Sequence, residues 1–181
     1  MIDEIMEYNR KFVENKGYEP YLTNKYPDKK LAILTCMDTR LLELLPAALG
    51  IKNGDAKIIK NAGGVIVHPY GSVVRSLLVG ILELGVEEVM VIGHTDCGVQ
   101  GMDGNEMLEK LVERGIDQQH IDIVRHSGID LERWLGGFES VESSVHETVR
   151  RLKDHPLMPK NVRISGFIMD SATGELTRVE E

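Results

Sequence analysis

The sequence predicts an α/β fold with a mostly parallel central β-sheet flanked by helices, an antiparallel C-terminal edge strand and an N-terminal helical arm. Two observations carry this prediction. Segments with the apolar pattern of strands alternate along the chain with segments of helical periodicity, which is typical of βαβ units. In addition, residues 31–36 form an almost continuous apolar run, which suits a strand that is covered on both faces, as in a parallel sheet.

The first thirty residues are expected to form a helix followed by an arm. Apolar residues recur at mostly helical spacing over residues 2–15 and the pattern ends at Gly17, which predicts an amphipathic helix. Residues 17–30 contain two prolines and three tyrosines without a clear period. They predict an extended arm that is long for a connection inside a compact domain. We therefore expect residues 1–181 to form a single domain whose residues 1–30 pack on a partner subunit.

The remaining elements follow from the same signals. After the strand at 31–36 we expect a short strand at 56–60, a helix at 71–84 and a third strand at 86–92 that Gly93 and His94 close. Helical patterns follow at about 104–115, 117–126 and 141–154, and residues 127–140 look like an irregular excursion. A fourth strand is expected at 162–169. The turn signal at 171–174 then predicts an antiparallel edge strand at 175–179.

The composition is that of an ordinary soluble globular protein. The chain has 21 Lys and Arg against 29 Asp and Glu, a net charge of −8, and 42% apolar residues. These values exclude disordered, collagen-like and disulfide-dense classes, and they argue against a nucleic-acid partner bound by bulk charge. No stretch approaches the roughly 18 apolar residues of a membrane span, and the acidic start does not resemble a secretory signal. We therefore expect a cytoplasmic protein with no membrane partner and with reduced thiols.

Both cysteines lie just after predicted strands. Cys36 ends the first strand, and Cys97 follows the third strand with His94 three residues before it. In open parallel sheets, ligand sites lie at the carboxyl ends of the strands. Thiolates and imidazoles are common Zn²⁺ ligands, and three protein ligands leave a fourth position open, as in catalytic sites. The sequence thus predicts one Zn²⁺ per chain on Cys36, His94 and Cys97, where it would turn a bound water into hydroxide near neutral pH.

Asp38 and Arg40 stand beside the first of these ligands. If the segment after Cys36 is an extended turn, alternate side chains face the same pocket. Arg40 can then hold Asp38 ionised and oriented, so that the carboxylate accepts a hydrogen bond from the zinc-bound water or hydroxide. Alternatively, Asp38 itself takes the fourth zinc position in a closed state, and no hydroxide forms. Without His94 and this pair, two free cysteines would more simply be small buried apolar residues.

The segments Cys36-Met37-Asp38-Thr39-Arg40 and His94-Thr95-Asp96-Cys97-Gly98 resemble the paired signatures C-x-D-x-R and H-x-x-C-G of the β-class carbonic anhydrases. The resemblance spans about residues 31–100, including Asn61-Ala62-Gly63-Gly64, and the short form is similar to the compact archaeal and Gram-positive branch. It implies a lyase, carbonate dehydratase, that reversibly hydrates carbon dioxide to bicarbonate and a proton. Its zinc ligands would be Cys36, His94 and Cys97, and Asp38 and Arg40 would be the catalytic, orienting dyad.

The same resemblance implies a homodimer or a higher homo-oligomer in which the N-terminal helix packs on the neighbouring subunit. Some members of the family bind regulatory bicarbonate with a Trp just before the first signature. No Trp lies in residues 31–35, so an open zinc site without this regulatory pocket is expected.

Other functions stay open at this point. The same zinc chemistry suits carbonyl sulfide or carbon disulfide, which are linear apolar molecules of similar shape. A structural or regulatory zinc protein with a closed site is a second alternative, although such a site needs no orienting pair. A thiol redox protein would pair Cys36 with Cys97, but the chain has no C-x-x-C motif.

His68 is either a proton shuttle or a loop or interface residue. The glycines of residues 61–64 are expected to allow close backbone approach near the metal pocket.

Overall fold

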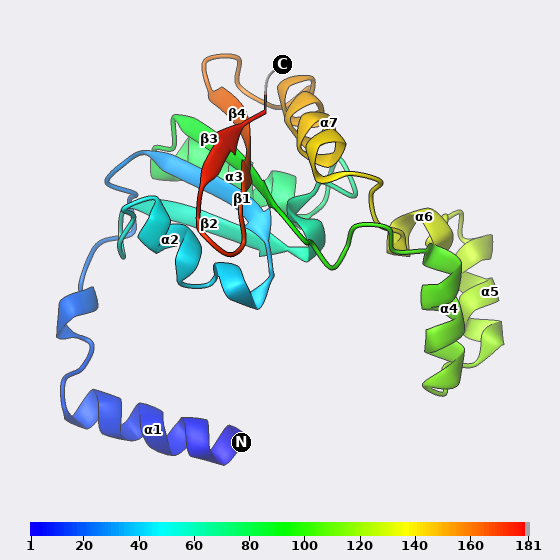
Figure 1. Ribbon diagram of the computed structural model, residues 1–181, viewed down its shortest axis with the longest axis horizontal. Helices are drawn as coiled ribbons and strands as arrows, with labels where there is room; N and C mark the ends of the chain where they lie inside the picture. Colours follow the sequence, from blue (N-terminus) through cyan, green and yellow to red (C-terminus); the bar gives the residue numbers. More distant parts are fainter. Residues whose placement is uncertain (180–181) are drawn as a thin grey trace.

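A five-stranded sheet forms the centre of the protein in the computed structural model, which describes residues 1–179 (Figure 1). The strand order is β2-β1-β3-β4-β5, with bounds β1 (Leu31–Cys36), β2 (Ala56–Asn61), β3 (Glu88–His94), β4 (Arg163–Met169) and β5 (Leu176–Arg178). The first four strands run parallel, and β5 pairs antiparallel with β4. This confirms the predicted fold class.

Helices connect the strands and extend beyond them. They are α1 (Ile2–Glu14), α2 (Leu44–Ala48), α3 (Ser72–Leu84), α4 (Gly104–Glu113), α5 (Gln118–His126), α6 (Leu131–Leu135) and α7 (Val141–Lys153). Three short 3-10 helices are η1 (Glu19–Tyr21), η2 (Thr39–Leu41) and η3 (Ala62–Gly64). None of the helices within residues 1–179 is long and apolar enough to span a lipid bilayer.

Two of the differences from the sequence-based expectation change the description of the fold. Residues 127–140 are not irregular throughout, because the Asp130 carboxylate accepts a hydrogen bond from the Arg133 backbone and caps α6. Leu131 at the start of α6 is then buried in a small cluster with Leu108 and Ile121. The third strand also begins two residues later than expected and continues through His94, which pairs with Met169 of β4. His94 is therefore part of the sheet, and its backbone position is fixed.

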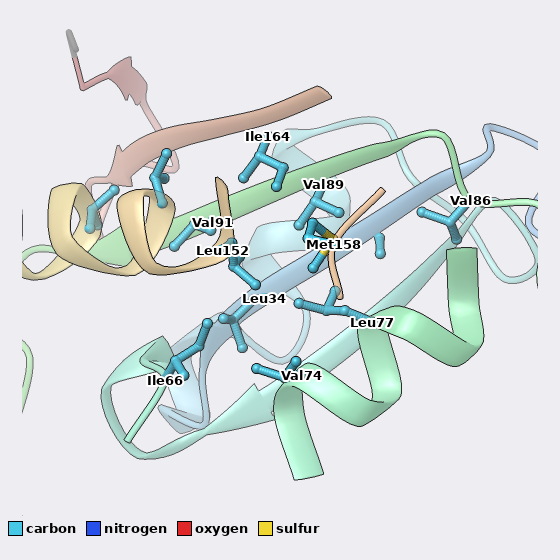
Figure 2. Close-up of a cluster of buried hydrophobic side chains, with 13 residues drawn as sticks. Leu34, Ile66, Val74, Leu77, Val86, Val89, Val91, Leu152, Met158 and Ile164 are labelled. Atoms are coloured by element: carbon cyan, nitrogen blue, oxygen red, sulfur yellow. The ribbon is translucent and has the colours of Figure 1, made fainter. Parts of the chain in front are cut away.

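Both faces of the sheet are covered. On one face, Leu34 and Val91 of the sheet pack with Leu77 of α3 and Leu152 of α7 in a cluster of buried side chains (Figure 2). On the other face, Ile33 belongs to a second cluster with side chains of η2 and α2. Burial of each large aliphatic side chain contributes about 1.5–3 kcal/mol. The end of β1 is thus held rigidly, as a metal ligand requires.

Two parts of the chain stand away from this core. Figure 1 shows α1 apart from the sheet at one side and α4, α5 and α6 as a lobe at the other. No residue of helix α1 is fully buried within residues 1–179, and its one half-buried side chain, Phe12, contacts Tyr21. Ile2, Ile5, Met6 and Val13 of this helix are all exposed, although they repeat at helical spacing.

Candidate metal centre

The three predicted ligands meet at the carboxyl ends of two neighbouring strands. Cys36 ends β1 and His94 ends β3, while Cys97 lies in the loop that follows β3. One residue before Cys36, the Thr35 hydroxyl donates a 2.9 Å hydrogen bond to the Ile92 carbonyl and joins these strand ends. The ligand atoms of Cys36, His94 and Cys97 all lie within 4.8 Å of one another, and all three residues are buried.

The spacing of the sulfur atoms fits a metal better than a disulfide. The Sγ atoms of Cys36 and Cys97 are 3.9 Å apart, and both cysteines are free. Two sulfurs bound to tetrahedral Zn²⁺ at about 2.3 Å would lie about 3.8 Å apart. The cysteine pair therefore has the separation of two zinc ligands.

His94 presents a free ring nitrogen to the same point. Its Nδ1 lies 2.9 Å from the Thr95 carbonyl oxygen and must donate, because a carbonyl only accepts. In the neutral ring this leaves the lone pair on Nε2. Within residues 1–179, Nε2 is buried without a hydrogen-bond partner of acceptable geometry. A buried polar atom of this kind costs about 1–3 kcal/mol, which a metal ion would offset. The donor set therefore fits Zn²⁺.

The charges of the three ligand residues influence one another. Burial by itself raises the pKa of the Cys36 thiol, but the neighbouring His94 ring and the backbone N–H groups of Asp38 and Gly63 outweigh it and lower this pKa to about 7. The same interaction with Cys36 raises the pKa of His94 against the effect of its burial. Burial also raises the pKa of the Cys97 thiol. Among the protein's own groups, Cys36 is thus the cysteine that ionises more readily.

Asp38 and Arg40 form a two-pronged ion pair next to the ligands. Arg40 Nε lies 3.0 Å from Asp38 Oδ1, and Nη2 lies 2.8 Å from Oδ2. The Arg40 guanidinium holds the pKa of the Asp38 carboxyl well below its usual range. Asp38 Oδ2 is 3.9 Å from His94 Nε2, and only 16% of the Asp38 side chain is exposed. An ionised carboxylate therefore borders the place where the three ligand atoms converge.

The backbone that brings this pair together differs from the expected extended turn. The chain bends into η2 directly after Asp38, whose carboxylate caps this short helix by accepting a 2.8 Å hydrogen bond from the Arg40 N–H. The expectation of an extended segment was therefore wrong. The two side chains meet because a capping Asp and the residue two positions later lie close together at the start of a helix.

Gly64 allows η3 to lie against the end of β1. Its φ of +66° lies in the left-handed region that favours glycine. A Cβ atom there would come within 2.9 Å of the Thr35 carbonyl carbon and 3.0 Å of the Cys36 nitrogen. This confirms that a glycine of residues 61–64 permits close backbone approach beside Cys36, one of the predicted metal ligands.

Of the other polar residues near the site, His68 was singled out from the sequence, whereas Asp96 and Ser171 were not. His68 lies exposed in the loop before α3, where its Nδ1 accepts a 3.1 Å hydrogen bond from the Tyr70 backbone. This position agrees with the expectation of a loop residue, and a proton shuttle stays an alternative. Sequence reasoning missed Asp96, whose carboxylate lies 2.8 Å from Arg40 Nη1. The only signal was an acidic residue between two ligands. It also missed Ser171, whose backbone N–H donates to the Thr95 hydroxyl at 3.0 Å.

Comparison with known proteins places this geometry in a family. A family model described as carbonic anhydrase matches residues 31–176. YvdA of Bacillus subtilis (strain 168), provisionally named a carbonic anhydrase, is 52% identical over 175 residues, covering 97% of this chain and 89% of YvdA. A carbon disulfide hydrolase of Acidithiobacillus thiooxidans is 31% identical over 158 residues, covering 82% of this chain and 76% of the hydrolase.

A solved structure agrees with the sequence relatives. The crystal structure of β-carbonic anhydrase isoform I (TvaCA1) from Trichomonas vaginalis superposes with a TM-score of 0.88 at 35% identity, covering 99% of this chain and 97% of that one. The match therefore covers nearly the whole chain, including the sheet and the N-terminal helix. The chain therefore belongs to the β-carbonic anhydrase family, as its two signatures predict.

Proposed function

We propose that this protein catalyses the reversible hydration of carbon dioxide to bicarbonate and a proton, with one Zn²⁺ per chain held by Cys36, His94 and Cys97. The observation that carries the proposal is the buried cluster of three ligand atoms within 4.8 Å of one another, bordered by an ionised carboxylate. Membership of the β-carbonic anhydrase family supports the same reaction.

The ligands set the chemistry that the site can perform. Zinc bound there would act as a Lewis acid that lowers the pKa of a coordinated water toward neutrality. Three protein ligands leave one position for this water or for the substrate. Because two thiolates neutralise much of the ion's charge, the orientation of the water depends strongly on neighbouring protein groups.

Asp38 is the group that we assign to this orientation. Its pKa is far below neutrality, so it acts as a hydrogen-bond acceptor and not as a proton donor. Oδ2 faces the ligand cluster and accepts a hydrogen bond from the attacking water, which fixes the lone pair that meets carbon dioxide. Arg40 keeps the carboxylate ionised and at a fixed angle through its two-pronged contact.

The same contact supports an open site over a closed one. Both Asp38 oxygens accept hydrogen bonds from Arg40. For Asp38 to become the fourth zinc ligand, its carboxylate would have to give up part of this network. We therefore propose that the fourth position stays free for water, which also argues against a purely structural or regulatory zinc site.

We further propose that the working unit is a homodimer or a larger assembly of this chain. Helix α1 exposes Ile2, Ile5, Met6 and Val13 to solvent. Burying each of these side chains on a second copy would contribute about 1.5–3 kcal/mol. A cytoplasmic location and the absence of membrane and nucleic-acid partners remain predictions from the sequence.

A second candidate is hydrolysis of carbon disulfide or carbonyl sulfide at the same zinc site. The observation that favours it is the 31% identity to a carbon disulfide hydrolase over 82% of this chain. Stopped-flow assays of the purified protein with each gas separate the two candidates. We expect proton release with carbon dioxide and little sulfide release. Negligible turnover of carbon dioxide with rapid release of sulfide would overturn the proposal.

A further inference from the structure

The Arg40 guanidinium is held from two sides. On one side Nε and Nη2 contact Asp38, as described above. On the other side Nη1 donates to Asp96 Oδ2, and Nη2 donates to the Asp96 carbonyl oxygen, both at 2.8 Å. Four of the five guanidinium N–H bonds are thus engaged. Rotation of the guanidinium would break contacts on both sides at once.

Asp96 adopts an unusual backbone conformation to make these contacts. Its φ of +54° places a residue other than glycine in the sparsely populated left-handed region. Its side chain is 86% exposed, so no burial of the carboxylate offsets this strain. An exposed ion pair alone contributes little to folding stability. In this conformation both the carboxylate and the carbonyl oxygen of Asp96 reach the Arg40 guanidinium.

Asp96 also links two segments that carry different parts of the site. It lies between the ligands His94 and Cys97, whereas Arg40 belongs to η2, the short helix that Asp38 caps. Through Arg40, the ligand loop and the orienting carboxylate are joined in one hydrogen-bonded unit. A shift of either segment would change the position of Asp38 relative to the ligands.

We propose that Asp96 is a positioning residue that fixes the rotation of the Arg40 guanidinium and, through it, the angle of the Asp38 carboxylate. The proposal rests on the function proposed above, because it concerns the same reaction. Asp96 makes no contact with substrate in this scheme. Its contact with Nη1 holds the guanidinium in the rotation in which Nε and Nη2 point at the Asp38 carboxylate.

Two substitutions distinguish the effect of the Asp96 side chain from the effect of its left-handed backbone conformation. Asp96→Asn keeps an oxygen acceptor and tolerates the left-handed region but removes the charge. Asp96→Gly relieves the backbone strain and removes the side chain altogether. Asp122→Asn is the matched control, because Asp122 is an exposed carboxylate that pairs with Arg125 in the distant lobe.

Three measurements on the full chain test the role. ¹⁵N NMR of the Arg40 side chain, identified by the signal that Arg40→Lys removes, reports guanidinium rotation. Zinc content shows whether the loop from His94 to Cys97 still holds its proposed ligands in place. The values of kcat and KM are measured with the gas that the wild-type protein turns over. For both Asp96 variants we expect faster rotation, one zinc per chain and a kcat about three- to tenfold lower, with the larger effect in Asp96→Gly. KM should change less than twofold, and Asp122→Asn should behave as wild type.

Several outcomes would overturn the proposal. If guanidinium rotation and kcat were the same in both Asp96 variants as in the wild type, the Asp96 carboxylate would not restrain Arg40. Faster rotation without loss of kcat would show that guanidinium order is irrelevant to the reaction. Loss of zinc from both variants would assign Asp96 to the ligand loop and not to Arg40. If the wild type fails to hydrate carbon dioxide, the proposed function fails, while the NMR comparison still decides whether Asp96 orders Arg40.

Discussion

Asp38→Asn would remove the charge that we propose orients the reacting water, while leaving the three proposed metal ligands untouched. The carboxylate accepts two side-chain hydrogen bonds and one backbone hydrogen bond from Arg40. An amide has one oxygen, so its NH₂ group would face a guanidinium N–H, donor against donor. The variant would thus lose both the acceptor aimed at the water and the pairing that holds it in place.

The expected loss can be estimated from the type of hydrogen bond. A hydrogen bond to a charged group is worth about 1.5–3 kcal/mol, which corresponds to a roughly 10- to 150-fold lower kcat/KM. Zinc content should stay at one ion per chain, because Asp38 is not among the clustered ligands. Stopped-flow hydration of carbon dioxide and metal analysis on the same sample would measure both quantities.

A matched control separates orientation of the water from helix capping. Asp103 caps α4 by accepting hydrogen bonds from the Asn105 and Glu106 backbones, and Asn is an equally good capping residue. Asp103→Asn should therefore retain full activity. If Asp38→Asn also kept wild-type kcat/KM, or if it lost zinc, Asp38 would not have the orienting role that we assign to it.

Three further predictions follow from the ligands, from the glycine beside them and from α1. His94→Ala should reduce zinc to well below one ion per chain, and metal analysis that found a full complement would refute its role as a ligand. Gly64→Ala should lower the free energy of unfolding by at least about 2 kcal/mol, because the methyl group would meet backbone. Gly50→Ala, with a similar φ but open space, should cost less, and denaturant unfolding compares the two. The double substitution Ile5→Glu and Met6→Glu should yield monomers in analytical ultracentrifugation, and an unchanged assembly would contradict packing through α1.

Much of the fold was predictable because the apolar residues of the core strands form runs in the sequence that indicate burial. The run at β1 is buried from Ala32 to Cys36, as a continuous apolar run predicts for a strand covered on both faces. Helix α6 was missed because its five residues are too short for periodicity to show. It depends instead on the Asp130 cap and on contacts with distant residues of the lobe.

The candidate site was predictable to a different degree in its two parts. The cluster of Cys36, His94 and Cys97 was predictable because the carboxyl ends of neighbouring parallel strands lie together. Asp96 was not, because an exposed acidic residue in a loop carries no special signal until Arg40 is seen to reach it. The bend into η2 was missed because the capping bond between Asp38 and the Arg40 backbone is a local choice that two-residue alternation does not predict.

The most direct test of the central claim is zinc stoichiometry measured together with carbon dioxide hydration on one preparation of the wild-type protein. The account predicts one zinc per chain and hydration activity that disappears when a chelator removes the metal and returns when zinc is restored. One zinc per chain without hydration at any pH would contradict it and would indicate a structural zinc site.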